Sequence, residues 1–111
     1  MTFSDLTALP GLSGKTSAAK TEITGVYCGD LLSHVMGKAP AGSAWVTVMN
    51  NINSVAVASL TEIACIVFAD GIAPSDEVLE RAGEKGISIA LSASSIFETA
   101  FLIYRVLEKG D

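Results

Sequence analysis

A run of five consecutive apolar residues at 65–69 (CIVFA) constrains the fold of this chain more than any other feature. A strand with one face in water alternates apolar and polar residues, whereas a parallel strand covered on both faces does not. Asp70 and Gly71 follow the run as turn formers, and the segment 74–77 (PSDE) begins a helix. The run therefore predicts a central parallel strand that is followed by a crossover helix.

Strands and helices alternate along the rest of the chain. Short apolar or alternating runs predict further strands at 21–27, 44–49, 55–58 and 87–91. Caps and apolar spacing predict helices at 30–38, 59–62, 76–85 and 95–108. This alternation predicts an α/β fold, a small single domain with a largely parallel sheet flanked by helices. The length of 111 residues suits one core.

The N-terminal residues have a different character. Residues 1–19 show little periodicity, so we expect a flexible N-terminal arm there and the α/β domain at 20–111. The segment 11–16 (GLSGKT) is similar to the end of a phosphate-binding P-loop. However, Leu9 occupies the position of the first glycine of that motif, and no buried strand precedes it. The sequence therefore predicts no P-loop.

Charge and hydropathy exclude two classes of partner. The net charge is −5 and the seven basic residues are scattered, which argues against nucleic acid, because phosphate binding needs clustered Lys and Arg. The mean hydropathy is +0.48, but the longest apolar stretch, 55–69, is interrupted by Ser59, Thr61 and Glu62. A spanning helix needs about 20 apolar residues, so no membrane partner is expected. The apolar excess predicts a surface for a second copy of the chain.

The two cysteines indicate the redox environment of the protein. Cys28 and Cys65 lie in or beside apolar segments and have no CxxC spacing. This pattern favours buried thiols in a reducing environment over a disulfide framework or a metal site. No charged start followed by an apolar core predicts export, so we expect a cytoplasmic protein.

Polar residues collect where the predicted strands end. If most strands are parallel, these loops share one rim of the sheet, and the start of the last helix offers backbone N–H groups to an anion. The candidate ligand-binding residues are Asp30, Asn50, Asn51, Asn53, Asp70, Gly71, Ser92, Ser94 and Ser95. In the alternative interpretation Asp30, Ser59 and Ser95 are helix caps and the asparagines are turn formers. The rim has no convergent Lys or Arg and no Gly-rich loop.

No set of side chains points to catalysis. His34 is the single histidine, and it has Asp30 four residues earlier but no nucleophile placed for it. One histidine and two distant cysteines do not make a usual zinc site, so neither a metal nor a cofactor is expected. The acidic residues of 76–84 form a solvated helix face.

Several segments, in order and spacing, resemble DRTGG-domain proteins over about 20–108. They are 25–36 (GVYCGDLLSHVM), 45–48 (WVTV), 53–58 (NSVAVA), 71–75 (GIAPS) and 94–104 (SSIFETAFLIY). The resemblance implies a compact α/β module related to the N-terminal domain of HPr kinase. That module is regulatory, often dimeric and without established catalysis. It accompanies CBS pairs in regulated pyrophosphatases or precedes phosphotransacetylase domains.

Two further points belong to the resemblance. Some stand-alone members are encoded near iron-only hydrogenase genes, which implies a hydrogenase or a signalling system as protein partner. Of the motif that names the family, only the closing glycine is kept, as Gly71 with Asp70 before it. A ligand function that depends on the full motif therefore does not carry over.

These observations predict a non-catalytic regulatory or interaction module that acts as a homodimer. Phe97, Phe101 and Tyr104 on the last helix are expected to supply core and dimer surface. The alternative is a sensor domain that binds an adenine nucleotide or another phosphorylated small molecule. Its site would be the strand-end rim or the dimer cleft. An enzyme is the least favoured class, because P-loop and general base are both missing from the pattern.

Overall fold

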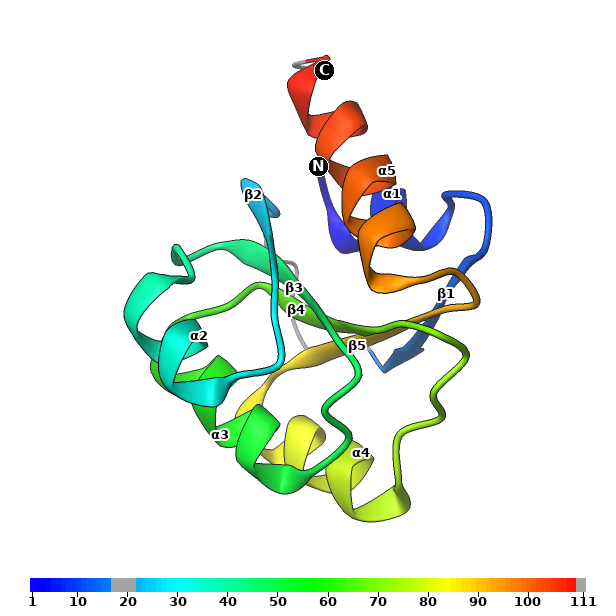
Figure 1. The fold of residues 1–111 in the computed structure, drawn as a ribbon. Coiled ribbons are helices and arrows are strands. Elements are labelled where there is room, and N and C mark those ends of the chain that lie inside the picture. Colours follow the sequence, from blue (N-terminus) through cyan, green and yellow to red (C-terminus); the bar gives the residue numbers. More distant parts are fainter. Residues whose placement is uncertain (17–21, 110–111) are drawn as a thin grey trace.

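The computed structural model of the protein describes residues 1–16 and 22–109, in which strands and helices alternate (Figure 1). The strands are β1 (Leu12–Thr16), β2 (Gly25–Cys28), β3 (Ser43–Thr47), β4 (Cys65–Phe68) and β5 (Ser88–Ser92). The helices are α1 (Phe3–Thr7), α2 (Leu32–Lys38), α3 (Ile52–Leu60), α4 (Asp76–Lys85) and α5 (Ile96–Glu108). The predicted α/β class is confirmed.

All five strands form one sheet in the order β1-β5-β4-β3-β2. Strands β2 to β5 are parallel neighbours in sequence order, and β1 pairs antiparallel with β5 at one edge. Every residue of β4 is buried, as expected for a parallel strand covered on both faces. The run at 65–69 is therefore the centre of the sheet.

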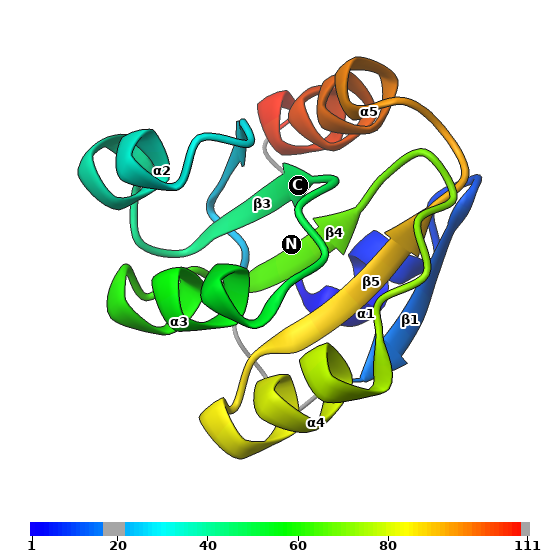
Figure 2. The same ribbon diagram turned by 60° about the horizontal axis from the view of Figure 1, so that its bottom comes forward.

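The helices divide between the two faces of the sheet. Three right-handed crossovers step across the sheet in one direction, which places α2, α3 and α4 on the same face. Helices α1 and α5 lie on the other face (Figures 1 and 2). Each face has its own core. The core under α2, α3 and α4 includes Val35, Trp45, Val55, Phe68, Val78 and Ile89. The core under α1 and α5 includes Leu6, Ile23, Val46, Cys65, Val67 and Ile103.

The two longest helices begin at the expected caps, and α4 ends at the expected glycine. The Ser75 hydroxyl accepts a hydrogen bond from the Val78 N–H at 3.2 Å and caps α4. Gly86 ends α4 with φ +71°, the left-handed conformation that favours glycine. At α5, Ser95 and Glu98 form the predicted capping box.

One predicted strand is a helix. Residues 55–58 were expected as a strand and 59–62 as a separate short helix, and both predictions are wrong: α3 covers Ile52–Leu60. The Asn51 side chain caps this helix by accepting from the N–H groups of Asn53 and Ser54 at 2.9 and 3.2 Å. A short apolar run rich in valine does not by itself distinguish a strand from a buried helix.

The expectation of a loose N-terminal arm is wrong for residues 1–16. A capping box between Thr2 and Asp5 begins α1, and Leu6 is fully buried beneath the sheet. Residues 12–16 then form β1. The segment similar to a P-loop is thus an edge strand rather than a turn before a helix. Residues 17–19 of the expected arm lie outside the described residues.

Candidate functional site

The candidate residues all lie at or just after the carboxyl ends of parallel strands, so they lie along one edge of the sheet as predicted. Asp30 follows β2, the three asparagines follow β3, and Asp70 and Gly71 follow β4. Ser92 ends β5, and Ser94 and Ser95 lead into α5. What this edge can bind depends on how far these groups are engaged with one another.

Asp30 ties two strand ends together rather than capping a helix. Its Oδ1 accepts hydrogen bonds from the Thr47 hydroxyl at 2.6 Å and from the Val48 N–H at 3.1 Å. Helix α2 begins after Leu31, which makes no side-chain cap. The predicted capping role of Asp30 is therefore wrong. His34 is exposed on α2, and no ion pair joins it to Asp30 within the part of the chain that the structure describes.

The side chains of Asn50 and Asn51 have structural partners. The Asn50 side chain donates from Nδ2 to the Ala73 carbonyl at 3.0 Å and accepts from the Ser75 N–H at 3.1 Å. It thereby fastens the loop after β3 to the loop after β4. Asn51 caps α3, and Asn53 lies in the first turn of that helix. These contacts match the alternative interpretation of the asparagines as caps and turn formers.

Asp70 and Gly71 form a tight turn at the end of the central strand. Their φ angles are +57° and +67°, and the Ile72 N–H donates to the Ala69 carbonyl at 3.0 Å. Two successive left-handed residues define a type I′ turn, for which Asp-Gly is a favoured pair.

The turn is held against the loop after β5. The Asp70 N–H donates to the Ser94 carbonyl at 2.8 Å, and the Gly71 N–H donates to the Ser92 carbonyl at 2.9 Å. The backbone N–H groups of this turn are therefore already paired.

The serines after β5 fix the start of α5. The buried Ser92 hydroxyl lies 2.7 Å from the Thr99 hydroxyl and accepts from the Ser94 N–H at 3.1 Å. The Ser95 hydroxyl accepts from the Glu98 N–H at 3.1 Å as the helix cap. This cap was predicted, whereas the Ser92–Thr99 contact was not, because only the folded chain brings the strand end against the helix.

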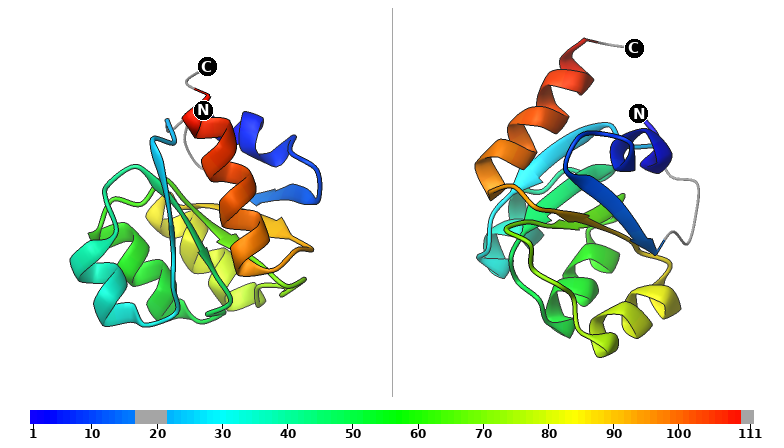
Figure 3. Two further views of the ribbon diagram at one scale, coloured as in Figure 1. Left: turned by 45° about the horizontal axis from the view of Figure 1, so that its top comes forward. Right: turned by 90° about the vertical axis from the view of Figure 1, so that its right-hand side faces the viewer.

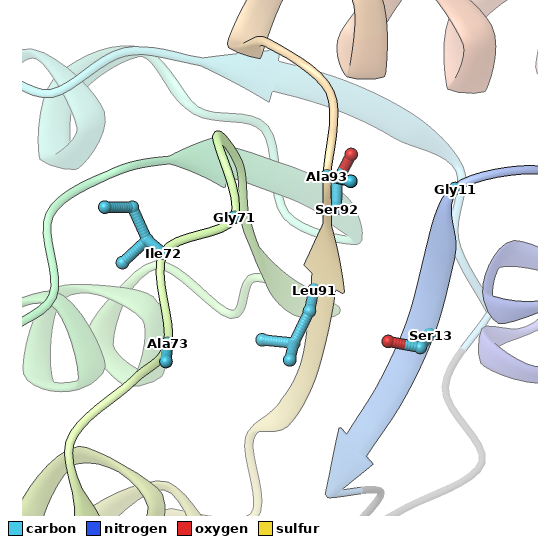
Figure 4. A pocket seen from close by; sticks show the side chains of 8 residues that line it. All are labelled: Gly11, Ser13, Gly71, Ile72, Ala73, Leu91, Ser92 and Ala93. Atoms are coloured by element: carbon cyan, nitrogen blue, oxygen red, sulfur yellow. The ribbon is translucent and has the colours of Figure 1, made fainter.

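A pocket lies where the path of the chain changes faces. The loop after β4 leads to α4 on one face, while the loop after β5 leads to α5 on the other (Figure 2). Such a switch point leaves a crevice outside the strand ends in open α/β sheets. Here it has a volume of about 230 Å³ (Figure 4). It is lined by Gly11, Ser13, Gly71, Ile72, Ala73, Leu91, Ser92 and Ala93.

Only two candidate residues, Gly71 and Ser92, line this pocket. The sequence could not reveal Gly11 and Ser13 as lining residues, because β1 was not expected to complete the sheet edge. The lining contains no charged side chain, and Leu91 projects from β5 toward Ala73 (Figure 4). The pocket therefore suits a small, flat and largely apolar group.

Three further features of the described residues are a buried thiol, the possible metal ligands and the lengths of the helices. Burial raises the pKa of the Cys65 thiol to about 12, so this thiol stays protonated and unreactive at neutral pH. Within residues 1–16 and 22–109, no group of three His, Cys, Asp or Glu side chains is placed to hold a metal ion. In the same residues, no helix is long and apolar enough to cross a bilayer.

A second surface of interest lies on α5. Phe97, Phe101 and Tyr104 are 73%, 48% and 51% exposed, and we call them the α5 aromatic stripe. Only Thr99 and Ile103 of this helix are buried. The expectation that the stripe supplies core is wrong, because the spacing of a wide apolar helix does not reveal which side meets the sheet.

The chain was compared with known proteins. No family model and no curated protein matches it. Among solved structures it is similar to the CBS and DRTGG domains of the regulatory region of Clostridium perfringens pyrophosphatase complexed with activator, diadenosine tetraphosphate. The TM-score is 0.64 at 13% identity, over 90% of this chain and 47% of the other.

This chain therefore spans about half the length of that solved chain. At this identity the likeness establishes the fold, in agreement with the resemblance to DRTGG domains.

Proposed function

We propose that this protein is a non-catalytic regulatory or interaction module that acts as a homodimer. The α5 aromatic stripe carries the proposal, because it presents three aromatic side chains on one helix face. Proteins that act as monomers rarely expose a contiguous apolar patch of this kind, and aromatic side chains are enriched in interfaces. The fold shared with a pyrophosphatase regulatory region supports the regulatory part of the proposal.

The polar edge of the sheet supports the non-catalytic part. Asp30, Asn50 and Ser92 are engaged in hydrogen bonds that join loops or fix helix starts. A general base needs a nucleophile or a substrate proton within reach, and these side chains are instead committed to the fold. Rim residues of this kind position the loops of a binding module.

The test of the homodimer is light scattering after size exclusion, over a wide range of protein concentration. We expect a mass that approaches twice 11.5 kDa as the concentration rises. The Phe97→Ser/Tyr104→Ser variant should remain a monomer. Leu60→Ser is the matched control, because Leu60 is 72% exposed on α3 at the opposite face. A monomer at every concentration, or equal loss in the control, would overturn the homodimer.

A second candidate function is favoured by the switch-point pocket. In it the protein is a sensor that binds an adenine nucleotide or another phosphorylated small molecule. The flat base would lie against Ile72 and Leu91, and the phosphate would face the start of α5 beyond Ser94. The pyrophosphatase regulatory region that has a similar fold was solved in complex with diadenosine tetraphosphate.

Thermal shift with AMP, ADP, ATP and dinucleotides tests the sensor. A ligand-dependent rise in melting temperature is expected, since a ligand that binds only the folded state stabilises it. Ala73→Phe should fill the pocket and abolish the rise, whereas Asn53→Ala, outside the pocket lining, should keep it. Loss of the rise in Asn53→Ala would move the site to the wider rim, and no rise in the wild type would reject the sensor.

The proposed setting is the cytoplasm, with a hydrogenase or a signalling system as the protein partner that the family resemblance implies. Cys28 and Cys65 are both free thiols, which supports a reducing compartment, but the prediction that both are buried is wrong for Cys28, whose side chain is exposed. Pull-down of a partner should depend on the dimer and therefore fail with Phe97→Ser/Tyr104→Ser.

A further inference from the structure

We infer that two copies of this chain pair through α5 in antiparallel orientation, with Phe101 next to the two-fold axis. The inference rests on the proposed homodimer and adds which surface pairs and in which direction. It comes from the aromatic stripe and from the charges beside it.

The stripe forms a straight contact line along the helix. Phe97, Phe101 and Tyr104 are spaced four and three residues apart, so they share one face. The rings of Phe97 and Phe101 stack at 5.8 Å between centroids, which makes a flat apolar surface. The C-terminal half of α5 rises above the body of the molecule (Figures 1 and 3), which leaves room for a second helix beside it.

The charges beside the stripe determine the direction of pairing. Glu98 and Arg105 are exposed and seven residues apart, so they lie on the same flank of the stripe and about 10 Å apart along the axis. In an antiparallel pair centred between them, each Glu98 lies opposite Arg105 of the second copy. In a two-fold parallel pair these flanks lie on opposite sides of the contact, so neither Glu98 nor Arg105 meets the opposite charge of the second copy.

Both charged groups are available for such a contact. The Arg105 guanidinium lies 5.7 Å from the centre of the Phe101 ring, and no carboxylate of the described residues forms an ion pair with it. The capping box engages Oε1 of Glu98, which leaves Oε2 for a second partner. The same helix face is thus apolar at its centre and self-complementary in charge at its edge.

The size of the contact predicts a weak dimer. A helix of 13 residues is about 20 Å long. One helix pair of that length buries less than the ~1,200 Å² at the lower limit of a stable interface. We therefore expect a dissociation constant in the micromolar range or above, and association that depends on protein concentration.

Disulfide cross-linking under mild oxidation tests the geometry in a Cys28→Ser background, which removes the exposed native thiol. Phe101→Cys should cross-link to itself because it lies next to the two-fold axis. Phe97→Cys alone should not, because its two copies would lie about 12 Å apart, beyond the ~7 Å limit between Cα atoms. A mixture of Phe97→Cys and Tyr104→Cys chains should form the mixed disulfide.

A charge exchange provides a second readout without oxidation. Arg105→Glu and Glu98→Arg should each weaken self-association about tenfold, because each creates two like-charge contacts. Mixing the two variants should restore association as a heterodimer. Melting curves of each variant confirm that the chains used are folded.

The outcomes separate the geometry from the homodimer itself. Self-cross-linking of Phe97→Cys and of Tyr104→Cys would indicate a parallel pair and overturn the inference. A dimeric mass by light scattering without any α5 cross-link, or without recovery on mixing, would also overturn it while the homodimer stands. A wild-type monomer at every concentration would reject both.

Discussion

The two faces of the sheet are covered to different degrees. On one face α3 packs between α2 and α4, and the three helices form a continuous layer over the core. On the other face α5 crosses β2 and β3, and the short α1 packs beside β1. The first layer presents single exposed apolar residues such as Leu60, whereas α5 presents three aromatic residues in a row.

This difference separates stability from association. The closed layer hides most of its apolar side chains inside the monomer, so those buried residues act on the free energy of unfolding. Helix α5 has apolar residues on both sides, and only the inner side meets the sheet. An exposed apolar face of this kind is typical of an interaction site, which agrees with the proposed homodimer.

The largest expected effect comes from one substitution made on the two faces. Phe68→Ala removes a fully buried ring from the core beneath α2, α3 and α4, and should cost about 3–5 kcal/mol of unfolding free energy. Phe97→Ala should change the stability of the monomer by less than about 0.5 kcal/mol. Urea unfolding at high dilution measures both. Equal losses would show that α5 is as deeply embedded as β4.

The next largest effect is a pH dependence of the free energy of unfolding, which shows whether water reaches the core beneath α5. Burial raises the pKa of the Cys65 thiol from 9.0 to about 12, so the folded state holds this proton more tightly than the unfolded chain. The Cys65 thiol should therefore not change the free energy of unfolding below about pH 8, and it should lower this free energy as the pH rises from 9 to 12. The fall should be at most about 1.4 kcal/mol per pH unit.

Unfolding curves of Cys65→Ala should lack this part of the pH dependence, while Cys28→Ala, at an exposed thiol, should keep it. An unchanged slope in Cys65→Ala would mean that water reaches the thiol.

Local signals predicted the parts of the fold that local chemistry decides. The unbroken run at 65–69 identified the central strand, and Ser75, Gly86 and Ser95 marked helix ends that the structure confirms. Residues 55–58 were misassigned because a short valine-rich run has no period that separates strand from helix. There the deciding contact is the Asn51 cap.

The candidate site was predictable only in part. That Asp30 and Asp70 share a rim follows from parallel strands, which the alternating pattern predicted. The pocket itself needed two facts that no local signal contains. One is that residues 12–16 add an antiparallel edge to β5, and the other is that α5 crosses to the opposite face.

A smaller loss of unfolding free energy is expected when the N-terminal cap of either long helix is removed. Ser75→Ala and Ser95→Ala each remove one acceptor for a helix N–H and should cost about 1 kcal/mol. Hydrogen exchange should show opening spread over α4 and its neighbours in Ser75→Ala, but confined to α5 in Ser95→Ala. No loss of stability in Ser95→Ala would mean that α5 unfolds separately from the sheet.

The smallest expected effect is a gain in unfolding free energy from a substitution after α3, on the closed face. Glu62 follows α3 and its C-cap Thr61, with φ +58° and an exposed side chain, while its carbonyl accepts from the Gly42 N–H at 2.9 Å. A side chain in the left-handed region is strained, so Glu62→Gly should raise stability by about 0.5–1 kcal/mol and keep that backbone bond. Glu80→Gly is the matched control, because Glu80 is exposed inside α4 and should lose about 1 kcal/mol. Opposite signs in urea unfolding would locate the effect in the backbone, and a loss in both would contradict it.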